Sequence, residues 1–193
     1  MPWEKSFDET VVLEKATEVF WKKGYEPASI NDLLKGTGLN RGSLYNAFGG
    51  KRALFTKALA SYDQDRRALL ASMEALDDPR KAVGAFFDEI VDRTVADQDH
   101  KGCFLFNTAL EFSCHDEEVK GIVTRGVGEI EAFFKRCIEV GQVRNEISKG
   151  LDPLTTARTL MSLLVSIRVL GRGVYAEAAL RGIAGEAKKL VGP

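Results

Sequence analysis

Apolar residues recur at intervals of three and four along most of the 193-residue chain, which is the spacing of amphipathic helices. In residues 7–23 these positions are Val11, Val12, Ala16, Val19 and Phe20. Gly24 then follows two lysines, a combination typical of a helix C-terminus. No stretch alternates apolar and polar residues for long enough to predict a strand. The pattern therefore predicts an all-α protein.

Two short helices are predicted next. Ser29 suits the N-cap of the first, and Asp32 at the third helical position makes a carboxylate variant of the capping box. Gly38 suits the left-handed conformation that ends a helix, and Asn40 provides a new N-cap before residues 41–48. Two short helices joined by a turn with glycine are typical of a helix-turn-helix.

The remaining sequence predicts longer helices, bringing the total to about nine. Their expected ranges are 51–76, 81–95, 103–114, 117–140, 155–170 and 175–190, with Pro153 suited to a first helical turn. We expect two domains: a three-helix N-terminal domain at residues 1–50 and a larger helical domain at residues 51–193. The helix at 51–76 would connect them.

The charges of the chain are unevenly placed, although its formal net charge is only −1. No Asp or Glu lies between Leu33 and Tyr62, whereas the same stretch contains Lys35, Arg41, Lys51, Arg52 and Lys57. This segment includes the turn and the second helix of the predicted helix-turn-helix. Its composition favours a polyanion as the partner.

Double-stranded DNA is the polyanion that a helix-turn-helix suits, because the N-terminal turn of its second helix lies nearest the base edges in the major groove. The residues at that turn are Arg41, Gly42 and Ser43, which we expect to contact bases. Cations and helix N-termini nearby would hold phosphates. The expected phosphate contacts are Ser29, Tyr45, Asn46 and Lys51.

The sequence from Ser29 to Phe55 resembles the signature of the tetracycline-repressor (TetR) family of transcriptional regulators. The matching positions are Gly42, Ser43, Leu44, Tyr45, Phe48, Lys51 and Leu54. Gly49 and Gly50 depart from the family pattern, which often has Pro or Ser there. The resemblance implies a regulator, most often a repressor, whose larger C-terminal domain binds an effector.

The resemblance also implies a homodimer formed by the last two helices, which would contact a palindromic operator. The apolar residues expected at the dimer interface are Leu160, Leu163, Leu164, Ile167, Leu180 and Ile183. The alternative is that this apolar face packs within its own domain.

A small apolar or amphipathic molecule is the effector class that the resemblance implies. Phenylalanines are concentrated in the second half of the chain, and the residues expected to line an effector pocket are Phe87, Phe106, Asn107, Glu111 and Phe134. Most of the phenylalanines are equally suited to a core, and the two polar residues to a buried network or to solvent.

Cys103 is a candidate thiol sensor, because it begins a predicted helix close to Lys101 and His100, which favours a thiolate. Gly102, Cys103, Asn107 and Glu111 also resemble a G-C-x-x-x-N-x-x-x-E pattern of one TetR branch, in which some members sense oxidants or electrophiles. The alternative is that Cys103 is a small core residue.

Other functional classes have little support in the sequence. Three cysteines at wide spacing predict free thiols rather than a disulfide framework, and no histidine or cysteine pair has the spacing of a metal site. We expect no cofactor, no metal, no membrane segment and no secretory signal, and hence a cytoplasmic protein. A small α-helical enzyme, or an interaction module that keeps the helix-turn-helix as a structural element, is the alternative to a regulator.

Overall fold

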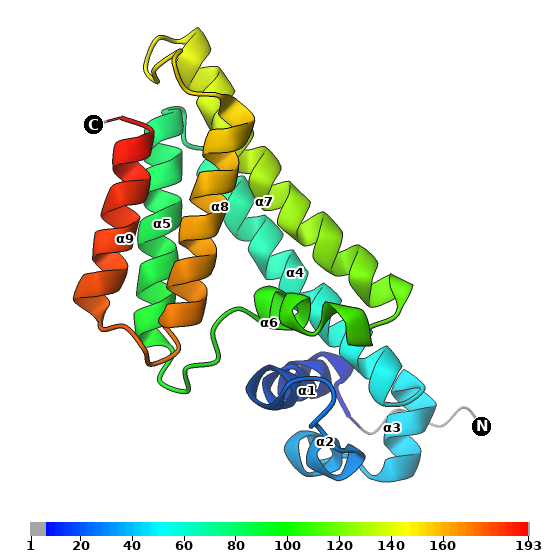
Figure 1. Cartoon of the computed structure of the whole chain (residues 1–193). Coiled ribbons are helices and arrows are strands. Elements are labelled where there is room, and N and C mark those ends of the chain that lie inside the picture. Colours follow the sequence, from blue (N-terminus) through cyan, green and yellow to red (C-terminus); the bar gives the residue numbers. More distant parts are fainter. Residues whose placement is uncertain (1–6, 193) are drawn as a thin grey trace.

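A computed structural model describes residues 7–192. This part of the chain contains α-helices, one short 3₁₀ helix and no strand, as the sequence predicts (Figure 1). The helices are α1 (Glu9–Lys23), α2 (Ile30–Thr37), α3 (Arg41–Phe48), α4 (Lys51–Glu74), α5 (Pro79–Ala96), α6 (Phe104–Leu110), η1 (Phe112–Cys114), α7 (Glu117–Val143), α8 (Pro153–Leu170) and α9 (Glu177–Leu190).

Helices α1, α2 and α3 form a small unit at one end of the molecule (Figure 1). The predicted caps of α2 are confirmed: the Ser29 hydroxyl accepts the Asp32 N–H at 3.1 Å, and the Asp32 carboxylate accepts the Ser29 N–H at 3.0 Å. Gly38 ends α2 with φ of 77°, and Asn40 caps α3. These local signals fix the angle at which α3 leaves α2.

Gly49 and Gly50 make the turn from α3 into α4. Their φ angles are 80° and 117°, values that residues with a Cβ atom rarely adopt. The departure from the family pattern at these positions therefore has a direct structural role, since this turn needs two successive residues with positive φ.

Helix α4 leads from the small unit into a bundle that it forms with α5, α7, α8 and α9 (Figure 1). Buried apolar side chains make one continuous core through both parts. Four phenylalanine rings from α5 and α7 occupy the centre of the bundle, with ring centroids 5.3–6.0 Å apart; they are Phe86, Phe87, Phe133 and Phe134. The bundle is thus held largely by aromatic packing.

The predicted helix at residues 103–114 is wrong in its second half. Helix α6 ends at Leu110, and the chain continues as the separate turn η1. Glu111 leaves the helical conformation, and its carboxylate accepts the N–H of Tyr25 from the loop between α1 and α2 at 3.3 Å. Asp116 then caps α7 by accepting two N–H groups. Cys103 and Cys114 consequently do not share one helix.

Gly126 lies where α7 crosses α4 and α6. A Cβ at this position would lie 2.9 Å from Cδ2 of Leu105 and 3.1 Å from Oδ1 of Asp63. Gly126→Ala should therefore lower the free energy of unfolding by about 1–3 kcal/mol, the usual cost of overpacking.

Gly128, on the same helix, provides the matched control because a Cβ there meets no atom within 4 Å. Gly128→Ala should raise stability by about 0.5–1 kcal/mol, since the unfolded chain loses conformational freedom. Urea denaturation of both variants tests the pair. Equal shifts in the two midpoints would contradict the packing described for Gly126.

Candidate nucleic-acid interface and interior cavity

The three expected base-contacting residues form the first turn of α3. Arg41 and Gly42 are exposed, and Ser43 is half-buried with its N–H donated to Oδ1 of Asn40 at 2.8 Å. Leu44 and Phe48, on the opposite side of the helix, are buried in the core. This burial holds α3 so that its N-terminal turn is presented to solvent.

Arg41 is held toward α2 in this structure, because its Nη2 donates to Oδ1 of Asn31 at 3.3 Å. One such hydrogen bond between exposed groups contributes little and is easily exchanged. The remaining N–H groups of the guanidinium keep the planar fork that suits a guanine edge. The hydrogen bond to Asn31 therefore orients the Arg41 side chain but does not prevent it from turning toward a base.

The four expected phosphate contacts lie at the N-cap of α2, on α3 itself and in the first turn of α4. The Ser29 hydroxyl is already used, since it donates to Asp32 at 2.7 Å. Tyr45 is 47% exposed, and Asn46 is also exposed. Lys51 is half-buried: its Nζ donates to the carbonyl of Glu26 at 3.1 Å and lies 4.6 Å from the centre of the Tyr25 ring.

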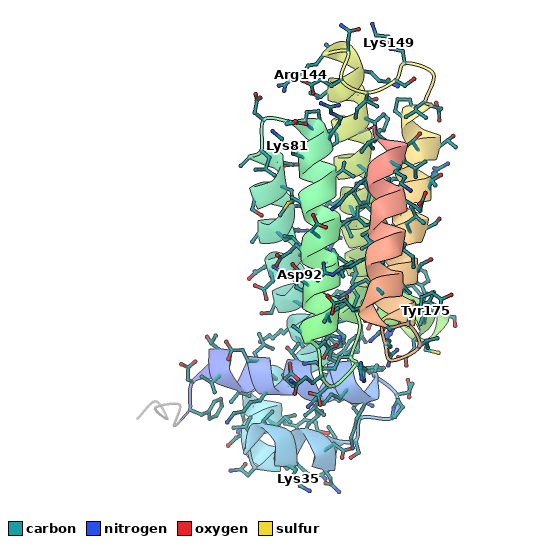
Figure 2. The ribbon with its side chains drawn as sticks, turned by 90° about the vertical axis from the view of Figure 1, so that its left-hand side faces the viewer. Lys35, Lys81, Asp92, Arg144, Lys149 and Tyr175 are labelled. Atoms are coloured by element: carbon teal, nitrogen blue, oxygen red, sulfur yellow. The ribbon has the colours of Figure 1, made fainter. Side chains whose placement is uncertain are left out.

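The charge of this surface is predominantly positive. Lys35, at the end of α2, is exposed at the tip of the small unit (Figure 2). Asp32 is the nearby acid, and hydrogen bonds from Lys23 and Ser29 hold the pKa of its carboxyl well below the ordinary value. Its charge is balanced by the ion pair with Lys23. The surface around α3 therefore keeps a positive balance.

A junction between η1 and the small unit was not foreseen from the sequence. Glu111, expected in an effector pocket, instead contacts Tyr25 as described above. His115 lies against the Phe55 ring, 5.2 Å between centroids and nearly parallel, and it also packs on Tyr25. Arg52 of α4 pairs with Asp116 at the start of α7. The signal in the sequence was the appearance of Glu111, His115 and Asp116 directly after the mostly apolar residues 103–110.

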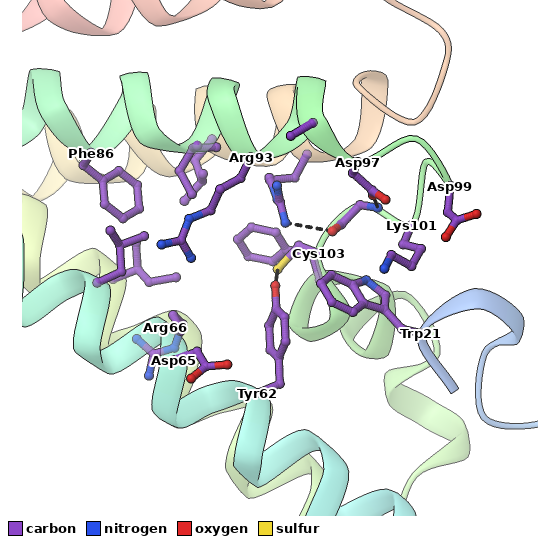
Figure 3. A pocket seen from close by; sticks show the side chains of 18 of the residues that line it. Trp21, Tyr62, Asp65, Arg66, Phe86, Arg93, Asp97, Asp99, Lys101 and Cys103 are labelled. Atoms are coloured by element: carbon purple, nitrogen blue, oxygen red, sulfur yellow. Dashed lines mark hydrogen bonds between the residues drawn. The ribbon is translucent and has the colours of Figure 1, made fainter. Parts of the chain in front are cut away.

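A cavity of about 610 Å³ lies among α4, α5, α6, α7 and α8 of the bundle, and Trp21 of α1 forms part of its wall (Figure 3). Of the five residues expected at an effector pocket, only Phe106 lines it. Phe87 and Phe134 are fully buried in the phenylalanine cluster. The Asn107 amide donates to the carbonyl of Lys101 at 2.7 Å and so stabilises the loop before α6. Aromatic residues at helical spacing could not be divided between core and cavity from the sequence alone.

Cys103 lines the same cavity and is the N-cap of α6. The thiol is 9% exposed, and the Tyr62 hydroxyl donates to its Sγ at 3.5 Å (Figure 3). Lys101 points elsewhere: it pairs with Glu18 and lies 4.6 Å from the centre of the Trp21 ring. His100 is exposed. The cations expected around the thiol thus have other partners.

Polar cavity residues that sequence reasoning missed are Tyr62, Arg66 and Arg168. Arg168 had a recognisable signal, because it is the one charge in the apolar run from Leu160 to Leu170 and it is buried. Arg66 was hidden in a charged stretch of α4. Its partners, Asp63 of the same helix and Glu129 of α7, come together only through helix packing.

The expected dimer residues divide into two groups. Leu160, Leu164, Ile167 and Leu180 are fully buried inside the protomer, so little of their surface remains for a partner. Leu163 and Ile183 are half-buried at the outer surface of α8 and α9. Ser166, one turn after Leu163, and Gly182, directly before Ile183, add small residues to α8 and α9 beside these two side chains.

The fold and the exposed first turn of α3 define a helix-turn-helix DNA-binding protein with a helical bundle attached. Residues 12–58 match the family model for bacterial regulatory proteins of the tetR family, and residues 79–183 match the tetracyclin repressor-like C-terminal domain. The chain belongs to the TetR family of transcriptional regulators, and it is not an enzyme.

Individual relatives agree with this assignment. The chain is 38% identical over 172 residues to YezE, an HTH-type transcriptional regulator of Bacillus subtilis, with 87% of this chain and 88% of the relative covered. It is 26% identical over 189 residues to the repressor ComR of Escherichia coli, covering 96% and 90%. A cysteine-substituted form of the TetR-family regulator CifR, solved with 26-base-pair operator DNA, superposes with a TM-score of 0.83 at 26% identity, covering 95% and 97%.

None of the helices within residues 7–192 combines the length and the apolar character that crossing a bilayer requires.

His115 should make stability depend on pH. Burial lowers its pKa below the ordinary value of about 6.5, against the opposing influence of Glu111, Asp116 and Glu26, while Lys120 lowers it further. The unfolded chain then binds the proton more tightly, so the folded state loses stability as pH falls below about 6.5 and is unaffected above it. In His115→Phe, the difference in free energy of unfolding between about pH 7.5 and pH 5.5 should shrink.

Urea titrations at the two pH values measure this difference. His100→Asn is the control, because His100 is exposed with a positive φ that Asn tolerates, and it should leave the pH dependence unchanged. An unaltered pH dependence in His115→Phe would show that His115 does not titrate differently on folding.

Proposed function

We propose that the chain is a cytoplasmic, dimeric repressor that binds a palindromic operator through α3 of each protomer and leaves it when an effector occupies the cavity. The observation that carries the DNA-binding part is the exposed turn from Arg41 to Ser43, held by a buried opposite face, with the nearby Asp32 paired to Lys23. We assign residues 1–50 to operator binding and residues 51–193 to effector binding and dimerisation, with α4 as the connection.

Base and phosphate contacts would be made by different residues. Arg41, Gly42 and Ser43 would face base edges, and Tyr45 and Asn46 would contact the backbone of the DNA. Lys51 would exchange the Glu26 carbonyl for a phosphate, a step that brings its charge closer to the DNA. Ser29 would bring the N-terminus of α2 close to a phosphate. Its hydroxyl would contribute less, because it already donates to Asp32.

The route from the cavity to α3 would pass through Trp21. This residue belongs to α1, yet it lines the cavity and packs edge-on against Tyr62 of α4 at 4.9 Å between centroids. An effector would therefore touch the DNA-binding unit itself as well as the bundle. A displacement of α1 relative to α4 would change the spacing of the two recognition helices in a dimer.

Cys103 adds a second way to sense a ligand in the same place. As part of this proposal, we assign the chain to the TetR branch with reactive cysteines. The assignment rests on its match to the G-C-x-x-x-N-x-x-x-E pattern at Gly102, Cys103, Asn107 and Glu111. Cys103 lines the cavity, so an electrophile would reach it by occupying the effector site. Cys137 is a poor resolving thiol, because burial raises its pKa to about 12.

The dimer would form through the outer face of α8 and α9, with Leu163 and Ile183 at its apolar centre. Small side chains at Ser166 and Gly182 would let the helices of two protomers approach closely. Two recognition helices related by a two-fold axis would then match two half-sites of a palindrome.

Operator selection from a random duplex pool, followed by salt titrations, tests DNA binding. Arg41→Ala should cost about 1–3 kcal/mol on the selected site and relax the base preference. Lys51→Ala should weaken binding to all sequences and lower the salt slope by about one.

Lys149→Ala is the matched control, because Lys149 is exposed at the opposite end of the molecule (Figure 2). It should change neither the affinity nor the salt slope. A pool without enrichment, or equal losses in Arg41→Ala and Lys149→Ala, would contradict the assignment of α3.

Sedimentation velocity tests the dimer. Thr159→Arg and Gly182→Arg each place a long charge on an exposed position of α8 or α9, and both should shift the protein toward the monomer. Gln64→Arg, on an exposed position of α4, should leave the dimer intact. Dimers of unchanged stability in the first two variants would place the interface on another surface.

A further inference from the structure

Two buried guanidinium groups line the cavity. Arg66 of α4 is 9% exposed and Arg168 of α8 is 7% exposed. Arg66 pairs with Asp63 and Glu129, but its Nη1 is buried without a hydrogen-bond partner in the described part of the chain. A buried donor left unpaired is costly, which indicates a position that something else fills.

Arg168 has no carboxylate partner among the described residues. Its Nη1 donates to Oγ1 of Thr94 at 2.8 Å and its Nη2 to the carbonyl of Gly102 at 2.7 Å, and both acceptors are neutral. A buried charge without a counter-charge is expensive, because the loss of hydration is not repaid. The wall of the cavity therefore carries one positive charge that no carboxylate of the described residues balances, beside the Tyr62 hydroxyl and the Cys103 thiol.

A third polar group lies beside this charge. Tyr62 is on the same face of α4 as Arg66, one turn earlier, and its hydroxyl interacts with Arg168 and Cys103. Burial raises the pKa of Tyr62, so the hydroxyl stays a hydrogen-bond donor at neutral pH. Arginine and tyrosine donors would thus converge on one region of the cavity.

The rest of the wall consists of an apolar inner part and a charged rim, in which Arg93 and Lys101 accompany three aspartates. The apolar lining comes from five helices and consists of Leu69, Phe86, Ile90, Phe106, Ile130 and Leu164. Asp65 and Asp99 are exposed and Asp97 is half-buried, so none of these three lining acids is as deeply buried as the two arginines. Asp99 is paired with Lys22, and Asp97 accepts the N–H of Gly102. Figure 3 shows Phe86 and Asp97 at opposite ends of the cavity.

We propose that the cavity binds a carboxylate joined to a hydrocarbon body, with the carboxylate paired to Arg168 and hydrogen-bonded by Tyr62, whose hydroxyl would exchange the Cys103 sulfur for a carboxylate oxygen. This rests on the proposed function in taking the cavity as the effector site, and it adds the chemical class of the effector. The guanidinium fork suits a planar carboxylate because two parallel N–H donors meet two oxygens. The hydrocarbon would lie on the apolar wall, and the free Nη1 of Arg66 offers a donor to a second polar group of the ligand.

The arrangement disfavours the two other amphipathic classes. A cationic ligand would bring a second positive charge beside Arg168, which costs energy in a buried site. A neutral alcohol would fill the apolar volume but leave the arginine without its counter-charge. The preference should therefore follow the charge of the head group and not the length of the tail.

Three ligands with the same ten-carbon tail separate these classes: decanoate, decan-1-ol and decyltrimethylammonium. Trp21 lines the cavity and reports occupancy by its fluorescence in a Trp3→Phe background, which leaves it as the remaining tryptophan. We expect decanoate to bind about 10- to 100-fold more tightly than decan-1-ol, as one charge-assisted contact provides. Equal affinities, tighter binding of the ammonium, or no decanoate binding at millimolar concentration would overturn the proposal.

Variants locate the charge effect. Arg168→Met should remove most of the preference for decanoate while changing decan-1-ol binding little, and Tyr62→Phe should reduce the preference by a smaller factor. Arg158→Met, an exposed arginine on the same helix, should keep the preference. Should Arg168→Met not fold, Tyr62→Phe and the three-ligand comparison on the parent protein still decide the matter. A full preference in Tyr62→Phe and Arg168→Met would overturn the proposal.

Release of a labelled operator, measured by fluorescence anisotropy, distinguishes this proposal from the function on which it rests. Decanoate that binds selectively without releasing DNA would support the carboxylate site and contradict the effector role of the cavity. If decan-1-ol releases DNA as effectively as decanoate does, the result would support the effector role of the cavity and overturn the charge selectivity.

Discussion

Packing around the Phe55 ring is the interaction on which the rest of the molecule depends. This ring of α4 lies 5.1 Å from Phe20, 4.8 Å from Tyr25, 5.5 Å from Phe104 and 5.2 Å from His115, measured between centroids. The four partners come from α1, the loop after it, α6 and the turn before α7. One side chain therefore joins the DNA-binding unit to the bundle through contacts in both, and neither part has a separate core.

This shared core determines how a signal would travel. Trp21 and Tyr62 extend the aromatic packing from Phe55 toward the cavity, so the cavity wall is built partly from the helix that supports the helix-turn-helix. Close-packed rings transmit displacement because they have little free volume to absorb it. The two arginines of the cavity wall are buried, so their charge matters more here than it would at the surface.

Local sequence signals predicted the local structure well. Ser29, Asn40 and Gly38 act through bonds within a few residues, so their roles in ending and beginning helices were visible without tertiary information. The recognition turn followed from the same signals together with the absence of acids. Fold class and family were predictable for the same reason.

The cavity was predicted less well, because its walls are defined by contacts between distant segments. Phe87 and Phe106 look alike in sequence, yet one is in the phenylalanine cluster and the other faces the cavity. Helix α6 ends before Glu111, whose carboxylate contacts Tyr25, 86 residues earlier in the chain. The periodicity of apolar residues does not indicate such a contact. Arg168 was the exception, since a single charge within an apolar run marks a buried polar site whatever its partners are.

The shared core also limits how freely such regulators can exchange parts. A chimera that takes its first 50 residues from another regulator would bring new residues to the places of Trp21 and Tyr25. Those residues would have to fill the space beside Phe55, Tyr62 and His115 before the new recognition helix could be held in place. Under the proposed assignment, substitutions on the exposed turn of α3 would change operator specificity readily, but replacement of the whole unit would require matched changes at the junction.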